Sequence, residues 1–330
     1  MTERPAMIAA TPDVDLLSDL LRDVRLSGSV FLHGRFTEPF GVTSPARWFE
    51  SQPLAHLRHV SVFHLIAGGR ASMELPDGGV VELTKEDLVL IPFTPEHRFW
   101  NGAVTEFVSG EDMLRPGPVP GLGEIAFGGG GPETRIICGF LESAELLPAP
   151  LFRSLPAMLV ERTAGDAVSA TLAASATSLI EQLDNDPQPG AEAMLGRLME
   201  LLFVEVLRRH SRRLPEGARG ILAASRDPIL ARAISALHRD PAQRWTIEDL
   251  ARYAGASRTV LNERFGDMIG KSPMDYLAGL RMQVACDLLR STRKALPHVA
   301  EDVGYESVAA FSRAFRRIVG VSPGAWREAI

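Results

Sequence analysis

Two short segments near the carboxyl end carry side chains that could hydrogen-bond to nucleic-acid bases and phosphates. In each segment, arginines alternate with small or polar residues at helical spacing. These residues are Arg258, Thr259, Asn262, Glu263 and Arg264 in the first segment, and Ala309, Ser312, Arg313, Arg316 and Arg317 in the second. They lie largely off the apolar stripes that contain Leu261 and Phe311, so helices formed here should present them outward. Polar groups of these types can read base edges, while arginines add affinity through phosphates.

Three further residues, His64, His97 and Cys138, are of types that bind zinc or another borderline metal. Histidines that are structural, or that line an effector pocket, are the commoner explanation, and metal binding at His64 and His97 is the alternative. Cys138 and Cys286 are the two cysteines and form no CxxC pair. This pattern suggests neither a disulfide framework nor a cysteine-based zinc finger. Cys286 adjoins apolar helical positions and is expected to fill a core.

The two polar segments belong to a repeated unit. Ala251 and Gly255 recur 49 residues later as Ala300 and Gly304. Five positions recur 50 residues later: Leu261, Phe265, Gly270, Pro273 and Tyr276 as Phe311, Phe315, Gly320, Pro323 and Trp326. In each unit a glycine would form the turn, and a serine, Ser257 or Ser307, would cap the next helix. The repeat predicts two helix-turn-helix units, at about residues 246–268 and 297–319.

The units differ in how their first helices begin. Thr246 can cap the first helix of unit one, whereas no serine, threonine or aspartate precedes Pro297 in unit two, so that helix should fray.

Between the units, residues 273–290 predict one long helix with Leu277, Leu280, Val284 and Leu288 inward. Such a helix spans roughly 27 Å. One turn of duplex DNA is ~34 Å. The second helix of each unit, called the reading helix below, could therefore enter one of two successive major grooves.

The first half of the chain has a different pattern. After a helical segment at residues 13–25, short β-type runs are separated by glycine and proline, which favours an antiparallel sandwich or barrel. These runs are Val60–Ile66, Ala71–Leu75, Val80–Leu83, Leu88–Ile91, Phe99–Phe107 and Thr134–Phe140. Two helices then follow, at about Asp166–Leu183 and Ala191–His210. The second of these helices carries a leucine stripe at residues 191–207. This stripe fits two roles about equally: packing in the core of the chain, or forming the interface of a dimer.

These patterns predict an α+β multidomain chain with three parts. Residues 1–160 would form a β-rich regulatory domain, residues 161–225 a helical linker or dimerisation segment, and residues 226–330 an all-α domain. The net charge of −6 is divided unevenly, since residues 1–224 carry −10 (19 basic, 29 acidic) and residues 225–330 carry +4 (16 basic, 12 acidic). A basic end on an acidic body is expected when one domain faces phosphates. With no apolar run long enough for a membrane span and no secretory pattern, a cytoplasmic, nucleoid-associated protein is expected.

The C-terminal repeat resembles the AraC/XylS family of bacterial transcription regulators. The resemblance covers about residues 227–326 and is carried by Trp245-Thr246-Ile247-Glu248-Asp249-Leu250-Ala251, Gly270-Lys271-Ser272-Pro273, Val303-Gly304-Tyr305-Glu306-Ser307 and Gly320-Val321-Ser322-Pro323. It implies base contacts from Thr259, Asn262, Glu263, Ala309, Ser312 and Arg313, with Arg258, Arg316 and Arg317 toward phosphates and Arg264 and Ser307 beside them. Glu263 departs from the basic residue often found there; a carboxylate can accept a hydrogen bond from cytosine.

The first 225 residues resemble, more loosely, the cupin-type sensor domain of one branch of these regulators. The matching pieces include Phe63-His64-Leu65-Ile66-Ala67-Gly68-Gly69, the segment from Pro92 to His97, and Cys138-Gly139. The resemblance implies an effector pocket near His64, His97 and Cys138. Cupin enzymes carry a His-x-His pair and a glutamate upstream, and this chain lacks that set, with Ser61 about where the glutamate would fall.

Together these features predict a non-enzymatic, sequence-specific regulator of transcription that binds promoter DNA and needs no cofactor. A small-molecule effector in the N-terminal barrel, a homodimer and contact with RNA polymerase are the further partners considered, and no membrane is expected. The alternative is a metal-dependent cupin enzyme with a DNA-binding appendage, which would need a complete metal site. A DNA-repair alkyl transferase fused to such a unit would need a multi-cysteine zinc site, which two isolated cysteines cannot supply.

Overall fold

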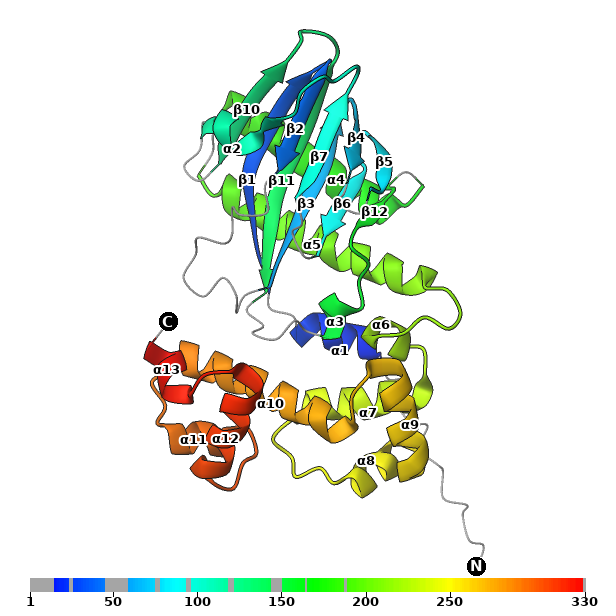
Figure 1. The fold of residues 1–330 in the computed structure, drawn as a ribbon, viewed down its shortest axis with the longest axis vertical. Helices are drawn as coiled ribbons and strands as arrows, with labels where there is room; N and C mark the ends of the chain where they lie inside the picture. The colour runs from blue at the N-terminus through cyan, green and yellow to red at the C-terminus, as the bar shows by residue number, and fades with distance from the viewer. Residues whose placement is uncertain are drawn as a thin grey trace, which may run out of the picture.

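In the computed structural model, two β-sheets face each other in the first half of the chain and helices form the second half (Figure 1). The structure describes residues 15–23, 26–44, 59–74, 78–92, 96–117, 122–143, 150–163, 165–186 and 189–328. The predicted helix at 13–25 is present as α1 (Leu16–Asp23), and its outermost positions lie outside the described residues. None of the helices within these ranges is long and apolar enough to cross a bilayer.

The larger sheet has seven strands in the order β12-β6-β3-β11-β1-β10-β9. Its strands are β1 (Leu26–Thr37), β3 (His59–Gly68), β6 (Leu88–Ile91), β9 (Arg115–Pro116), β10 (Gly123–Gly128), β11 (Glu133–Ser143) and β12 (Leu159–Glu161). All pairs are antiparallel except β1 with β10. Both faces of the sheet are buried, because Phe63 and Leu65 of β3 face the helices while Ile66 faces the other sheet.

The smaller sheet has five strands in the order β5-β4-β7-β2-β8. They are β2 (Phe40–Ser44), β4 (Arg70–Glu74), β5 (Val80–Thr84), β7 (His97–Asn101) and β8 (Val108–Ser109). Each of the six predicted strand runs overlaps an observed strand, but the run predicted at Phe99–Phe107 begins two residues late and extends too far. Strand β7 ends at Asn101 because Gly102 turns the chain with a φ of 78°. The described strands form two facing sheets that do not close into one barrel.

Helices α4 (Ala167–Asn185) and α5 (Ala191–Arg213) confirm the two helices predicted after the strands. They pack on each other, and α5 crosses β1 on the outer face of the larger sheet. The leucine stripe is divided between two environments. Leu195, Leu202 and Leu207 are buried in the core, whereas Leu198 is half-buried and its neighbour Leu201 is exposed.

The remaining chain is helical. It contains α6 (Ile221–Ala224), α7 (Pro228–Arg239), α8 (Ile247–Ala254), α9 (Arg258–Ile269), α10 (Pro273–Ser291), α11 (Leu296–Asp302), α12 (Val308–Val319) and α13 (Pro323–Glu328). Two four-residue helices, α2 (Gly110–Met113) and α3 (Pro150–Arg153), lie earlier in the chain. Figure 1 shows α1, α3 and α6 between the sheets and the C-terminal helices. Helix α1 packs on α7, with Leu16 and Leu20 buried.

Candidate DNA-binding interface

The first helix-turn-helix unit is formed by α8 and α9, and its local signals act as predicted. The Thr246 side chain accepts a hydrogen bond from the Asp249 amide and begins α8. Gly255 ends α8 in the left-handed conformation, with a φ of 73°, which favours glycine because it has no β-carbon. The Ser257 hydroxyl then accepts from the Val260 amide and begins α9. These three residues set where α8 begins and ends and where α9 begins.

Helix α9 has one buried and one exposed face. Leu261 and Phe265 are buried, and the five residues predicted to bind DNA are all exposed: Arg258, Thr259, Asn262, Glu263 and Arg264. Two of the arginines already have partners within the protein. Arg258 donates to Glu248 of α8, and Arg264 donates to Asp227, which caps α7. Arg264 therefore lies at the edge of the exposed face and ties α9 to α7.

The second unit repeats this construction in α11 and α12. Gly304 supplies the turn with a φ of 81°, and the Ser307 hydroxyl accepts from the Ala310 amide at the start of α12. The cap residue of α11 is Ala295, which makes no side-chain hydrogen bond, and Pro297 occupies the first turn. The absence of a side-chain cap on α11 confirms the difference predicted from the sequence.

Helix α12 buries Phe311, Phe315 and Val319. On its other side, Ser307, Ala309, Arg313, Arg316 and Arg317 are exposed and Ser312 is half-buried. Within the described ranges, the side chains of Arg313 and Arg316 form no ion pair. The second unit therefore offers cations that are available to an anionic partner.

Helix α10 joins the two units and begins at the Ser272 cap, which accepts from the Asp275 amide. Its 19 residues correspond to about 28 Å. The predicted inward face is correct at Leu277, and Leu280, Val284 and Leu288 are half-buried and pack against the cores. Partners pack on both sides of α10, so Met282, Ala285, Cys286 and Leu289, which the prediction did not include, are buried as well. Cys286 is buried in that core, which confirms its predicted role.

The sheet domain contains a second group of candidate residues. His64 of β3 lies beside Cys138 of β11, because these two residues are directly paired across the strands. His97 comes from β7 of the other sheet. The His64 Nδ1 atom is 2.9 Å from Cys138 Sγ, and His64 Nε2 is 2.8 Å from His97 Nε2. All three side chains are buried, at 1%, 6% and 3% exposure for His64, Cys138 and His97.

Burial sets the protonation of this His–His–Cys chain. It lowers the pKa of His64 well below its usual range, and the neighbouring His97 lowers that pKa further. Burial also raises the pKa of the Cys138 thiol. At neutral pH the imidazole of His64 is therefore uncharged and Cys138 is a thiol, which are the states that an apolar interior favours.

This arrangement does not fit a metal ion, although cupin domains often hold one. The two sides of the His64 ring face different partners, Cys138 and His97, so the three donors do not converge on one point. Among the described residues there is no group of three or more histidine, cysteine or carboxylate side chains suited to a metal. Ser61, at the position of the enzymatic glutamate, donates instead to the Pro92 carbonyl. His64 and His97 thus have the geometry of a buried hydrogen-bonded pair.

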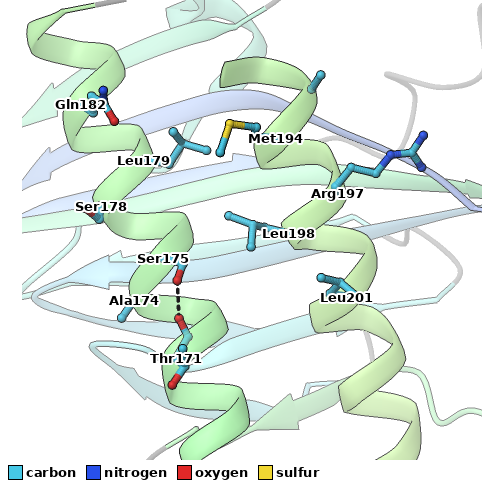
Figure 2. A pocket seen from close by; sticks show the side chains of 11 residues that line it. Thr171, Ala174, Ser175, Ser178, Leu179, Gln182, Met194, Arg197, Leu198 and Leu201 are labelled. Carbon is cyan, nitrogen blue, oxygen red and sulfur yellow. Dashed lines mark hydrogen bonds between the residues drawn. The ribbon is translucent and has the colours of Figure 1, made fainter. Parts of the chain in front are cut away.

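A third feature is an open groove between α4 and α5, with a volume of about 1020 Å³ (Figure 2). The α4 wall is mostly small and polar but includes one leucine: Thr171, Ala174, Ser175, Ser178, Leu179 and Gln182. The α5 wall is mostly apolar but includes one arginine: Ala193, Met194, Arg197, Leu198 and Leu201. Met194 is 60% exposed and Leu201 is 53% exposed. The leucine stripe of residues 191–207 contributes Leu198 to this groove and Leu195 to the core, and its periodicity alone does not separate the two environments.

A two-sheet domain followed by two helix-turn-helix units, each with an exposed second helix, defines a DNA-binding regulator of transcription. The Cupin family model matches residues 15–212, which is more than half of the chain, and the helix-turn-helix domain model matches residues 250–329. The chain belongs to the AraC family of helix-turn-helix regulators that carry an N-terminal cupin domain.

Three relatives illustrate the similarity. An AraC-like transcription regulator of Streptomyces antibioticus is 33% identical over 62% of this chain and 67% of its own length. One of Streptomyces lividans is 38% identical over 46% of this chain, and the match spans half of that relative. The HTH-type transcriptional regulator AlkR of Acinetobacter baylyi is 26% identical over 96% of this chain and 99% of its own length. All three are regulators rather than enzymes, and so is this chain.

Proposed function

We propose that the chain binds a bipartite DNA site, with α9 and α12 in successive major grooves on one face of the duplex. The observation that carries this proposal is the division of both helices into a buried apolar face and an exposed polar face. The length of α10, about 28 Å, is close to one turn of B-DNA at ~34 Å. The excess of basic residues after position 225 adds attraction to the phosphates.

The exposed residues divide into base readers and phosphate binders. On α9, Thr259, Asn262 and Glu263 would face base edges, with Arg258 toward a phosphate. On α12, Ser312 and Arg313 would hydrogen-bond to bases and Ala309 would contact a thymine methyl, while Arg316 and Arg317 face the backbone. Arg264 and Ser307 would lie at the edge of the DNA-contacting surface, since Arg264 pairs with Asp227 and Ser307 caps α12.

Selection from a randomised duplex library with the full-length protein tests this function. The recovered sequences should contain two conserved blocks about one helical turn apart. Footprinting on the region upstream of the gene would then locate a natural site. Recovery of no preferred sequence at moderate salt, with or without an extract of the host cells, would contradict the proposal.

We further propose that a small molecule bound between the two sheets controls this DNA binding. The His–His–Cys chain supports the proposal, because three polar side chains are buried in an interior otherwise lined by residues such as Val89, Phe99 and Ile136. A ligand with an apolar body and one hydrogen-bonding group could replace the bond between His64 and His97. Native mass spectrometry of the protein purified from its host should detect such a ligand, and His97→Phe should lose it. The idea would be refuted if the wild-type protein carried no ligand and the substitution His97→Phe left promoter occupancy unchanged.

We also propose that the groove between α4 and α5 pairs with a second copy of the chain. A twofold axis through the groove would place Met194, Leu198 and Leu201 of one copy against the small residues Ala174 and Ser175 of the other. Such a surface is self-complementary, as a twofold interface requires. Dimerisation would bring two DNA-binding domains to one promoter and raise the affinity for paired sites.

A further inference from the structure

The two helix-turn-helix units have separate apolar cores. The core of the first unit reaches Tyr276 and Leu277 on α10, whereas the core of the second unit begins at Met282 and surrounds Phe311 and Phe315. The boundary falls between Leu277 and Met282, within little more than one turn of α10. A continuous core therefore does not hold the two reading helices at their relative angle.

Arg281 lies at this boundary, in the middle of α10. Its Nε atom donates to the Pro241 carbonyl at 2.7 Å, and its Nη2 atom donates to the Gln243 carbonyl at 2.8 Å. Both acceptors belong to the segment between α7 and α8, which is part of the first unit. The same guanidinium lies over the ring of Tyr305, 5.6 Å from its centre, in the turn of the second unit. One side chain of α10 thus contacts both units.

The turn of the second unit also touches the same segment directly. A β-carbon at Gly304 would lie 2.4 Å from the Ala242 carbonyl oxygen and 2.9 Å from Nη2 of Arg281. Only a residue without a side chain allows this approach, and the φ of 81° favours glycine as well. An ion pair between Arg244 and Glu306, 2.9 Å long, crosses the same boundary. Both of its side chains are mostly exposed, so this pair holds the units only weakly.

We infer that Arg281 is a positioning residue that sets the angle and separation of α9 and α12, and through them the spacing of the two DNA half-sites. It acts through the Pro241–Gln243 segment and Tyr305 and needs no contact with DNA. This inference rests on the proposed function, in which both helices bind one duplex. Two linked binding modules gain affinity only when their geometry lets both bind at once. Loss of Arg281 should therefore weaken binding to the full site and leave each half-site unaffected.

The binding test compares Arg281→Met with Arg290→Met, which removes the same charge from the same helix. The probes are a duplex selected by the wild-type protein, a copy with one half-site scrambled, and copies with one or two base pairs inserted between the half-sites. We expect Arg281→Met to bind the full site about tenfold more weakly or worse, to bind the half-site duplex normally, and to tolerate the insertions better than wild type. Arg290→Met should behave as wild type. Equal losses on full and half-site duplexes, or no loss, would overturn the inference.

A second measurement does not depend on DNA. Spin labels at Asp267→Cys on α9 and Glu301→Cys on α11, both exposed positions, report the distance between the units in the full chain. Cys138 and Cys286 are buried and should label poorly. Arg281→Met should broaden the distance distribution, and Arg290→Met should not. An unchanged distribution would refute the role of Arg281, whereas failure of the wild-type protein to select DNA would refute the proposed function alone.

Discussion

Arg258 donates a hydrogen bond to Glu248, 2.5 Å away, and so joins the first turn of α9 to the preceding helix. This hydrogen bond is the main reason that the pKa of Glu248 lies below its ordinary value. Both side chains are well exposed, so the pair contributes little to stability. Its effect is to hold a cation at the beginning of the reading helix, where a phosphate would approach.

Arg258→Ala should weaken binding to every duplex by a similar factor. A phosphate contact carries no sequence information, and its loss should reduce the slope of log affinity against log salt by about one. Fluorescence anisotropy at several salt concentrations measures both quantities. Glu248→Gln is the matched control, since it keeps the guanidinium and removes a nearby negative charge; its affinity should be equal to or higher than that of wild type. A loss confined to one DNA sequence would contradict a phosphate role.

Arg313→Ala should reduce binding to the preferred site by ~1–3 kcal/mol and relax the preference at one base position. Arg313 is exposed on α12, where a guanidinium can pair with a guanine edge. Arg317→Ala is the comparison, because a backbone contact should lower affinity for all sequences alike. Binding to libraries randomised at single positions separates the two effects. If Arg313→Ala leaves every base preference intact, Arg313 does not read a base.

Glu263→Gln should change which base is preferred opposite the middle of α9. The Glu263 carboxylate can only accept hydrogen bonds and so suits the cytosine amino group, whereas a glutamine amide suits adenine. The same libraries should show a change from cytosine to adenine at one position. An unchanged base preference would place Glu263 outside the set of base readers.

Met194→Glu should convert a dimer into monomers, because it puts a carboxylate into the apolar groove between α4 and α5. Sedimentation velocity at several protein concentrations gives the association state. Val80→Glu is the control, since Val80 is 57% exposed on β5, away from the groove. The dimer proposal is wrong if wild-type protein sediments as a monomer throughout, or if both variants dissociate equally.

Acid should destabilise the folded protein through His64. Its pKa is lowered in the folded state, mainly by burial and further by His97, whereas in the unfolded chain it is about 6.5. Below that pH the unfolded state binds the proton first, so the free energy of unfolding falls by up to about 1.4 kcal/mol per pH unit. Denaturant titrations between about pH 7.5 and about pH 5.5 measure this slope. His64→Leu should reduce it, leaving the part due to His210, whose pKa burial also lowers.

Local signals allowed much of the C-terminal half to be predicted. Thr246, Ser257 and Ser307 cap helices, and Gly255 and Gly304 form turns, because each acts on backbone groups within a few residues of itself. The exposed faces of α9 and α12 followed from helical spacing for the same reason. The prediction for α10 was incomplete because neighbours pack on two sides of this helix: Leu280 and Leu288 are half-buried against the cores, and Met282 and Ala285 are buried as well.

Local residue patterns were enough to predict the two helix-turn-helix units, the helix between them and the β-rich first half. Tertiary packing brought His64, Cys138 and His97 together, since strand register pairs β3 with β11 and sheet packing adds β7. It alone placed Arg281 between Pro241 and Tyr305, and Arg264 beside Asp227. These contacts join residues far apart in the chain. Their energy depends on how whole helices and strands pack, and a short stretch of sequence does not contain that information.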